Sequence, residues 1–272
     1  MTADRTALRR FSFNQATAQH WALPELVAGC VAAGVPGLGL WREPVAEYGL
    51  ARCAKLVRGA GLAVTTLCRG GFFTAGDWRD QNLRAIDEAA TLGAPVLVLV
   101  SGGLPAGSKD IDGARARVAD AIAELAPHAD AAGVTLAIEP LHPMFSADRC
   151  VIATLGQALN IAERFAPSVV GVVVDAYHVW WDDTVYEQIA RASEWIASFQ
   201  VCDWITPLPE GVLLGRAMPG DGCIELRRLR AAVDAAGYTG PIEVEVFNAE
   251  VWARPGDQVL AAAIDGYLRE VT

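Results

Sequence analysis

Residues 129–139 read Ala-Asp-Ala-Ala-Gly-Val-Thr-Leu-Ala-Ile-Glu, which combines a helix end, a glycine, a short apolar run and a carboxylate. Gly133 suits a helix end because glycine accepts the left-handed backbone that stops a helix. The continuous apolar run after it is typical of a strand buried on both faces of a parallel sheet. Helical segments elsewhere also close on glycine before an apolar run, at Gly34, Gly61, Gly93 and Gly237.

Eight such strand-helix units follow one another along the 272 residues. The expected strands are 10–14, 37–41, 63–67, 96–100, 135–139, 171–175, 198–201 and 242–246. The expected helices are 23–33, 46–59, 77–92, 112–132, 154–165, 184–195, 225–236 and 256–270. A doubly wound open sheet would need a glycine-rich phosphate turn after the first strand, and residues 13–17 (FNQAT) are no such turn. The sequence predicts a (β/α)8 TIM barrel in which residues 1–272 form one domain.

The composition limits the classes of partner. The formal net charge is −10 and the basic residues are scattered, which argues against a nucleic-acid partner. No apolar run approaches the roughly 18 residues that cross a bilayer, and the start from Met1 to Arg10 lacks the apolar stretch of a signal peptide. We therefore expect a cytoplasmic protein with a small-molecule substrate and no membrane partner. A homo-oligomer is left open, and the six scattered cysteines are expected to be reduced, buried thiols.

Polar side chains close the strands of the second half of the chain. Glu139 follows the fifth strand, Asp175 ends the sixth, Gln200 lies in the seventh, and Glu245 lies in the eighth. In a TIM barrel these positions meet at one mouth. A carboxylate at the end of an apolar strand is unfavourable unless it is paired or bound to metal, so three of them together indicate a cation site. Glu243 shares a face with Glu245 and is expected near the start of its strand, in an ion pair or in water.

These strand ends resemble the sugar isomerase and epimerase superfamily of xylose isomerase-like barrels. The relevant motifs are Glu139, Asp175-Ala-Tyr-His178, Gln200-Val-Cys-Asp203, Gly220-Asp221-Gly222 and Glu245.

The resemblance implies one divalent metal held by Glu139, Asp175, Gln200 and Glu245. The family usually has a histidine where this chain has Gln200. An all-oxygen ligand set favours Mn²⁺ or Mg²⁺ over Zn²⁺.

The resemblance also implies a chemistry in which Glu139 and Glu245 exchange a proton at the carbon next to a carbonyl, through an enediolate. His178 would hold a substrate oxygen beside the metal. His142 is either a second acid-base group or a loop hydrogen-bond donor. Arg216 is either a ligand for a substrate oxygen or phosphate or an exposed loop arginine. Trp41-Arg42 and Cys68-Arg69 end the second and third strands, so both arginines are expected to face the mouth, and Trp41 and Arg69 are expected to bind the substrate.

The sequence therefore predicts a metal-dependent isomerase or epimerase acting on a ketose or a related sugar derivative. The alternative is a lyase of the same superfamily, such as a relative of inosose dehydratase or a β-eliminase of an oxidised glycoside. An abasic-site nuclease ranks third, because the chain is acidic and short of histidines. Non-catalytic binding ranks last, because it leaves the carboxylates unexplained.

Overall fold

The computed structural model describes residues 7–209 and 212–272. Residues 1–6 lie outside the described residues. The predicted domain and the expectation about a signal peptide both include them. Eight strands form a closed parallel barrel with the neighbour order β1-β10-β7-β6-β5-β4-β3-β2. They are β1 Phe11–Asn14, β2 Gly37–Trp41, β3 Ala63–Gly71, β4 Val96–Val100, β5 Thr135–Ile138, β6 Val170–Asp175, β7 Ile196–Val201 and β10 Ile242–Val244.

A short antiparallel hairpin, β8 (Asp203–Trp204) with β9 (Arg216–Ala217), projects from the end of β7. The TIM barrel fold expected from the eight repeats is confirmed.

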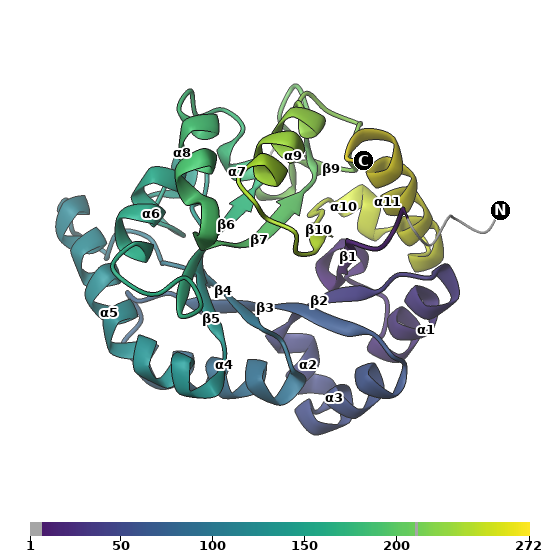
Figure 1. Ribbon diagram of the computed structural model, residues 1–272, viewed down its shortest axis with the longest axis horizontal. Helices are drawn as coiled ribbons and strands as arrows, with labels where there is room; N and C mark the ends of the chain where they lie inside the picture. The colour runs from purple at the N-terminus through teal and green to yellow at the C-terminus, as the bar shows by residue number, and fades with distance from the viewer. Residues whose placement is uncertain (1–6, 210–211) are drawn as a thin grey trace.

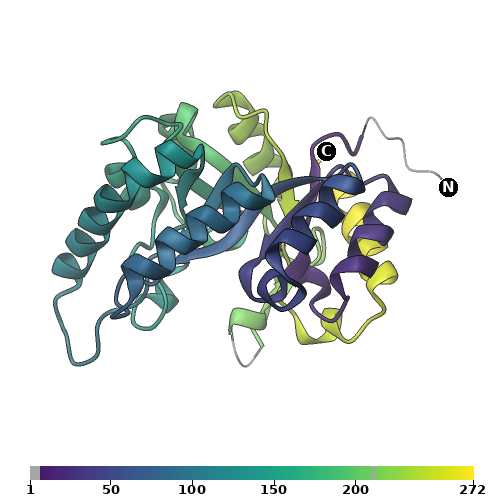
Figure 2. The ribbon, with the colours of Figure 1, turned by 90° about the horizontal axis from the view of Figure 1, so that it is seen from below.

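Helices surround the strands on the outside of the barrel (Figure 1). Seen from below, α3, α4 and α5 lie in a row against the barrel wall (Figure 2). The α-helices are α1 Leu23–Ala33, α2 Arg42–Tyr48, α3 Leu50–Gly59, α4 Trp78–Leu92, α5 Ile111–Ala132, α6 Leu155–Ala162, α7 Ala176–Val179, α8 Val185–Ala192, α9 Leu226–Ala235, α10 Ala249–Trp252 and α11 Gly256–Glu270. Single 3-10 turns are η1 Gln15–Ala18, η2 Pro143–Phe145, η3 Ser193–Trp195 and η4 Val212–Leu214.

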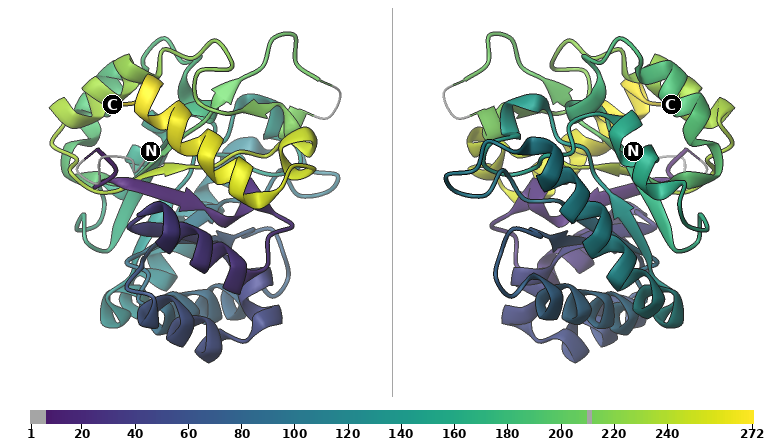
Figure 3. Two further views of the ribbon diagram at one scale, coloured as in Figure 1. Left: turned by 90° about the vertical axis from the view of Figure 1, so that its right-hand side faces the viewer. Right: turned by 90° about the vertical axis from the view of Figure 1, so that its left-hand side faces the viewer.

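The two ends of the described chain meet where the barrel closes. β1 pairs with β10, with Phe11 opposite Ile242, and the ring of Phe11 contacts Tyr267 of α11 edge to face at 4.9 Å. Figure 3 shows α11 lying beside α1 and across β1. The last helix therefore covers the first strand, and this contact joins the eighth unit to the first.

Apolar side chains fill two regions of the barrel. The larger core lies between the strands and the helices, and a small separate cluster consists of Cys68, Val96, Val98, Ala137 and Val173. Buried polar residues accompany it, among them Ser12, Asn14, Thr65, Thr66, Gln200 and Glu243. The strands thus bury a polar layer under the acidic residues of the mouth.

Several expected elements differ from the structure, and the strand expected over 242–246 already ends at Val244. The segment expected as one helix over 46–59 belongs to two helices, because Gly49 adopts φ +98° and ends α2 before α3 begins. The third strand continues to Gly71, beyond the expected end at residue 67. All six cysteines are free, and only Cys223 is exposed. Over residues 7–209 and 212–272 we find no helix with the length and apolar character needed to cross a membrane.

Candidate metal centre

The acidic residues predicted at the strand ends converge at one mouth of the barrel. Glu139 follows β5, Asp175 ends β6, Gln200 lies opposite Asp175 in β7, and Glu245 follows β10. All four side chains are buried, with exposed fractions of 5, 0, 1 and 3%. Strand order places them on four consecutive strands, β5-β6-β7-β10. The parallel arrangement, rather than any local contact in sequence, brings them together.

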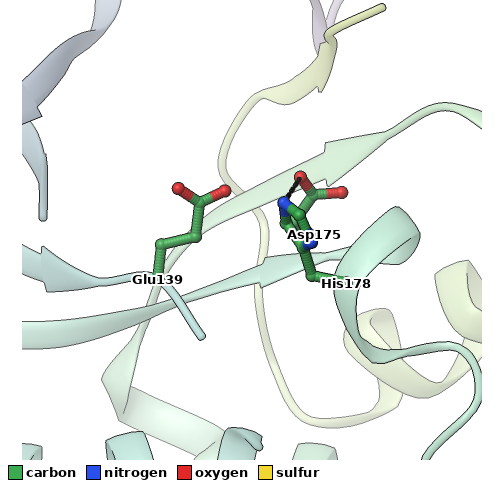
Figure 4. Close-up of side chains that lie close together, drawn as sticks. All are labelled: Glu139, Asp175 and His178. Carbon is green, nitrogen blue, oxygen red and sulfur yellow. Dashed lines mark ion pairs between the residues drawn. The ribbon is translucent and has the colours of Figure 1, made fainter. Parts of the chain in front are cut away.

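His178 lies with Glu139 and Asp175 in a group whose candidate ligand atoms are all within 4.8 Å of one another (Figure 4). Asp175 begins α7 by accepting a hydrogen bond from the Tyr177 N–H at 2.9 Å, and this turn brings His178 back over the carboxylates. The His178 Nδ1 accepts a hydrogen bond from the His142 N–H at 3.1 Å. Burial, followed by the nearby Arg216 charge, lowers the pKa of His178 well below its usual range, so the ring is neutral.

Arg216 lies inside the acidic group, which excludes the alternative of an exposed loop arginine. Its Nη1 donates to Asp175 Oδ2 at 3.0 Å and to Glu245 Oε2 at 3.1 Å, and its Nη2 lies 3.0 Å from His178 Nε2. The guanidinium also stacks over the rings of Tyr177 and Phe247. The residue predicted to bind substrate therefore also neutralises two of the predicted metal ligands.

The carboxylates still exceed the available positive charge. Glu139, Asp175 and Glu245 oppose the single guanidinium of Arg216. Burial, and then the charges of Asp175 and Glu245, raise the pKa of Glu139 well above its usual range. Burial raises the pKa of Glu245 to about 8, against the opposing effect of Arg216. The two glutamates therefore tend to hold protons in this group, and a cation bound among the carboxylates would stabilise their charged forms.

Two buried oxygens of this group have no hydrogen-bond partner among the described residues, Gln200 Oε1 and Glu245 Oε1. Buried polar atoms are nearly always satisfied, so an orphaned pair in one site indicates a missing ligand. Carboxylate and amide oxygens are the donors that hard divalent cations prefer. The residues present therefore fit a divalent metal, for which Glu139, Asp175 and His178 offer ligand atoms close to one another. Gln200 and Glu245 stay predicted ligands, because no contact of the described residues places their oxygens in that group.

The expectation that Glu243 lies in an ion pair or in water was wrong. Its side chain is 1% exposed, and its carboxylate accepts hydrogen bonds from neutral groups. The donors are Asn14 Nδ2 at 2.7 Å, Thr66 Oγ1 at 2.8 Å, Thr65 Oγ1 at 2.9 Å and Gln200 Nε2 at 3.2 Å. Polar side chains of β1, β3 and β7 lie at the same level of the barrel and surround this carboxylate. Strand parity in β10 alone could not predict these partners, because they come from other strands.

Asp203 and the Gly-Asp-Gly turn form a structural unit beside the site. The Asp203 carboxylate accepts hydrogen bonds from the N–H groups of Gly220 and Ile224, both at 2.9 Å. A Cβ at Gly222 would lie 2.5 Å from Asp203 Oδ1, so this position requires glycine. The unit fastens the segment after β9, and thereby fixes the strand that carries Arg216.

A cavity of about 140 Å³ opens above the acidic group. Of the predicted substrate-binding residues, Trp41, Arg69, His178 and Arg216 line it. His142 does not. It lies behind His178, packed between the rings of Trp181 and Trp204 with centroids 5.2 Å away.

Arg42, expected at the mouth, instead pairs with Glu88 of α4. Sequence reasoning missed several lining residues, among them Phe72, Arg149 and Phe247. Strand parity from Glu245 could have indicated Phe247. No sequence signal marks Arg149, which reaches the cavity from a long loop.

The comparisons with known proteins agree with this architecture. A family model described as xylose isomerase-like TIM barrel matches residues 27–271. The chain is 27% identical to an inosose isomerase of Halalkalibacterium halodurans over 147 residues, which are 53% of this chain and 50% of that protein. It is 30% identical to a 3-dehydroshikimate dehydratase of Pseudomonas aeruginosa over 270 residues, which are 92% of this chain and 40% of that protein. The chain thus spans half or less of the length of these curated relatives.

Solved structures extend the comparison to the whole fold. Protein SMc04130 of Sinorhizobium meliloti is 47% identical, with a TM-score of 0.94 over 97% of this chain and 99% of that chain. The structure of the IOLI protein with a bound zinc atom has a TM-score of 0.81 at 21% identity, over 96% of this chain and 98% of that chain, a likeness of fold alone. With the closed barrel, these matches confirm the resemblance inferred from the strand ends, and this chain belongs to the xylose isomerase-like TIM barrel family.

Proposed function

We propose that this protein is a metal-dependent isomerase or epimerase of a ketose or related sugar derivative. One observation carries the proposal. Glu139 and Glu245 line the same cavity from β5 and β10, which are separated in the barrel by β6 and β7. Two carboxylates on different walls of one cavity can remove a proton from one face of a substrate carbon and return a proton to the other.

The chain's own residues supply most of the proposed mechanism. His178 and Arg216 hold the substrate oxygens, and Trp41 packs against the carbon skeleton. Glu139 or Glu245 removes the proton from the carbon next to the carbonyl, and the opposite glutamate delivers a proton to give the product. A bound divalent cation, Mn²⁺ or Mg²⁺ in this proposal, supplies the positive charge that stabilises the developing enediolate. The oxygen ligands, with Gln200 in place of a histidine, support the choice of metal.

A lyase is the second candidate, and one observation favours it. The 3-dehydroshikimate dehydratase aligns with 92% of this chain, against 53% for the inosose isomerase. A dehydratase begins with the same loss of a proton and then expels a neighbouring hydroxyl group. The two functions therefore share Glu139 and Glu245 and differ in the fate of the intermediate.

Turnover in D₂O separates these functions. Wild-type protein loaded with Mn²⁺ is incubated with candidate ketoses, inososes and dehydroshikimate, and the products are analysed by NMR and mass spectrometry. Deuterium at the α-carbon with all oxygens retained supports the isomerase or epimerase, whereas loss of a neighbouring hydroxyl supports the lyase. Turnover of a verified substrate with neither deuterium uptake nor a kinetic isotope effect contradicts both.

A further inference from the structure

We propose that Arg69 and Arg149 form an anion subsite, so that the substrate carries a carboxylate or phosphate in addition to its reacting hydroxy-ketone. This inference rests on the proposed function only in taking Glu139 and Glu245 as the reacting groups of the cavity. Both arginines line the same cavity as these glutamates.

The two guanidinium groups have no acidic partner. Neither Arg69 nor Arg149 takes part in a side-chain ion pair or side-chain hydrogen bond within residues 7–209 and 212–272, although both are half-buried. Two nearby arginines do have acidic partners. Arg42 pairs with Glu88 at 2.5 Å, and Arg216 pairs with Asp175 and Glu245. An arginine that is half-buried, faces a cavity and lacks a carboxylate is placed to bind a ligand anion.

The surrounding structure fixes both positions. Arg69 lies in β3, and its guanidinium carbon sits 3.6 Å from the centroid of the Phe72 ring. Arg149 donates its backbone N–H to the Phe145 carbonyl at 2.9 Å. The next residue, Cys150, forms a β-bridge with Gly102 after β4. The side chains thus project from anchored backbone, which lowers the entropy lost when a ligand binds.

Electrostatics supports the same arrangement. Burial lowers the pKa of Arg69; the nearby Cys68 and Glu43 oppose this, and the positive charge of Arg149 adds to it. Two like charges at one cavity repel each other, and an anion between them would relieve the repulsion. The cavity is therefore lined both by acidic side chains, Glu139 and Glu245, and by basic side chains that lack an ion pair among the described residues, Arg69 and Arg149.

This combination of charges defines a substrate class. The carboxylates suit a hydroxy-ketone with its cation, and the two arginines suit an oxyanion that guanidinium groups can bind in a fork. We infer a compact sugar acid, ring-ketone acid or sugar phosphate. A neutral ketose leaves the two arginines unpaired, and an amino sugar meets two like charges.

Binding of three ring polyols that differ in one group tests the inference. The probes are myo-inositol, which is neutral, quinate, which has a carboxylate, and myo-inositol 1-phosphate. Each is titrated calorimetrically into the full chain loaded with Mn²⁺. At least one anion should bind tenfold or more tighter than myo-inositol, with an affinity that falls as salt is added. The better anion identifies the carboxylate or the phosphate as the preferred group.

Variants assign the effect to the two arginines. Arg69→Gln and Arg149→Gln should each weaken anion binding by about 10- to 100-fold, as expected for loss of a charge-assisted hydrogen bond, and leave myo-inositol within about twofold. Arg69→Lys should lose less than Arg69→Gln, because it keeps the charge without the fork. Arg84→Gln, at an exposed position of α4, is the matched control and should change nothing.

The inference fails if both anions bind no tighter than myo-inositol, if neither anion binds at millimolar concentration, or if the variants weaken all three probes equally. Because the binding experiment requires no turnover, failure of this inference can be distinguished from failure of the proposed function. Tight anion binding without α-proton exchange on any substrate contradicts the proposed function alone. Proton exchange on a neutral ketose with unchanged rate in both arginine variants contradicts this inference alone.

Discussion

Glu243 and Glu245 are two residues apart in the β10 region and equally buried, yet their surroundings differ completely. Glu243 accepts hydrogen bonds from four neutral side chains, and none of the described cations pairs with it. Glu245 has a single charged partner, Arg216, and its Oε1 has no partner among the described residues. A buried carboxylate that is fully hydrogen-bonded serves the structure, whereas one left incomplete is ready to bind a ligand. Gln200 shares features of both, since its Nε2 donates to Glu243 and its Oε1 has no partner among the described residues.

The largest expected effect comes from removing the charge of the incomplete carboxylates. Glu245→Gln and Glu139→Gln should each lower kcat by about 10²- to 10⁴-fold, because each group moves a proton in the proposed reaction. Glu250→Gln, an exposed glutamate of α10, is the control. Rates are measured with metal content determined on the same samples, since metal affinity will also fall. Full activity of either variant would remove that glutamate from the mechanism.

The next largest effect is expected at the amide side chain of Gln200. Gln200→Leu deletes the free Oε1 and should weaken Mn²⁺ binding by roughly 100-fold. Loss of a residue that only orients a metal ligand weakens binding by about 10- to 100-fold, and loss of a ligand should weaken it at least as much. Gln200→His should keep metal binding and shift the preference towards Zn²⁺ or Co²⁺. Calorimetric titrations with each metal, alongside circular dichroism to check the fold, make the measurement. An unchanged metal profile in both variants would mean that Gln200 is not a ligand.

A smaller effect is expected from Glu243, whose carboxylate is fully hydrogen-bonded. Glu243 accepts from Gln200 Nε2 and so fixes which end of the amide is left for a ligand, namely Gln200 Oε1. Glu243→Gln introduces an N–H donor that allows the Gln200 amide to turn over, and should weaken Mn²⁺ binding by about 10- to 100-fold. Ser12→Ala removes only the contact to Thr65 in the same polar layer and is the matched control. Equal Mn²⁺ affinity in wild type and Glu243→Gln would show that Glu243 has no part in orienting the ligand.

The smallest effect is a pH dependence of metal binding. The pKa of Glu245 is about 8, so below that pH a bound proton competes with the metal. Mn²⁺ affinity should therefore rise as the pH increases towards 8, and Glu139, whose pKa is also raised, adds to this dependence. The metal-free protein has the opposite trend, because a raised folded-state pKa removes stability as the pH rises from the usual glutamate value towards 8. Titrations and thermal unfolding with and without chelator measure both, and Glu245→Gln should reduce both dependences.

The sequence alone determined the barrel and the members of the acidic group. Helix-ending glycines and continuous apolar strands repeat eight times, and a parallel barrel necessarily brings strand ends such as Glu139 and Asp175 to one mouth. Local backbone preference and strand order are written in the chain itself, so these predictions needed no contact information.

The tertiary structure decided how each charge is compensated. Parity in β10 put Glu243 and Glu245 on one face, but only the closed barrel shows that Asn14, Thr65 and Thr66 surround the first. Likewise, a hairpin far along the chain delivers Arg216 into the acidic group, and a loop brings Arg149 to the cavity. The physical reason is that the free energy of a buried charge depends on partners from other strands and loops, whose positions are set by packing and not by local sequence.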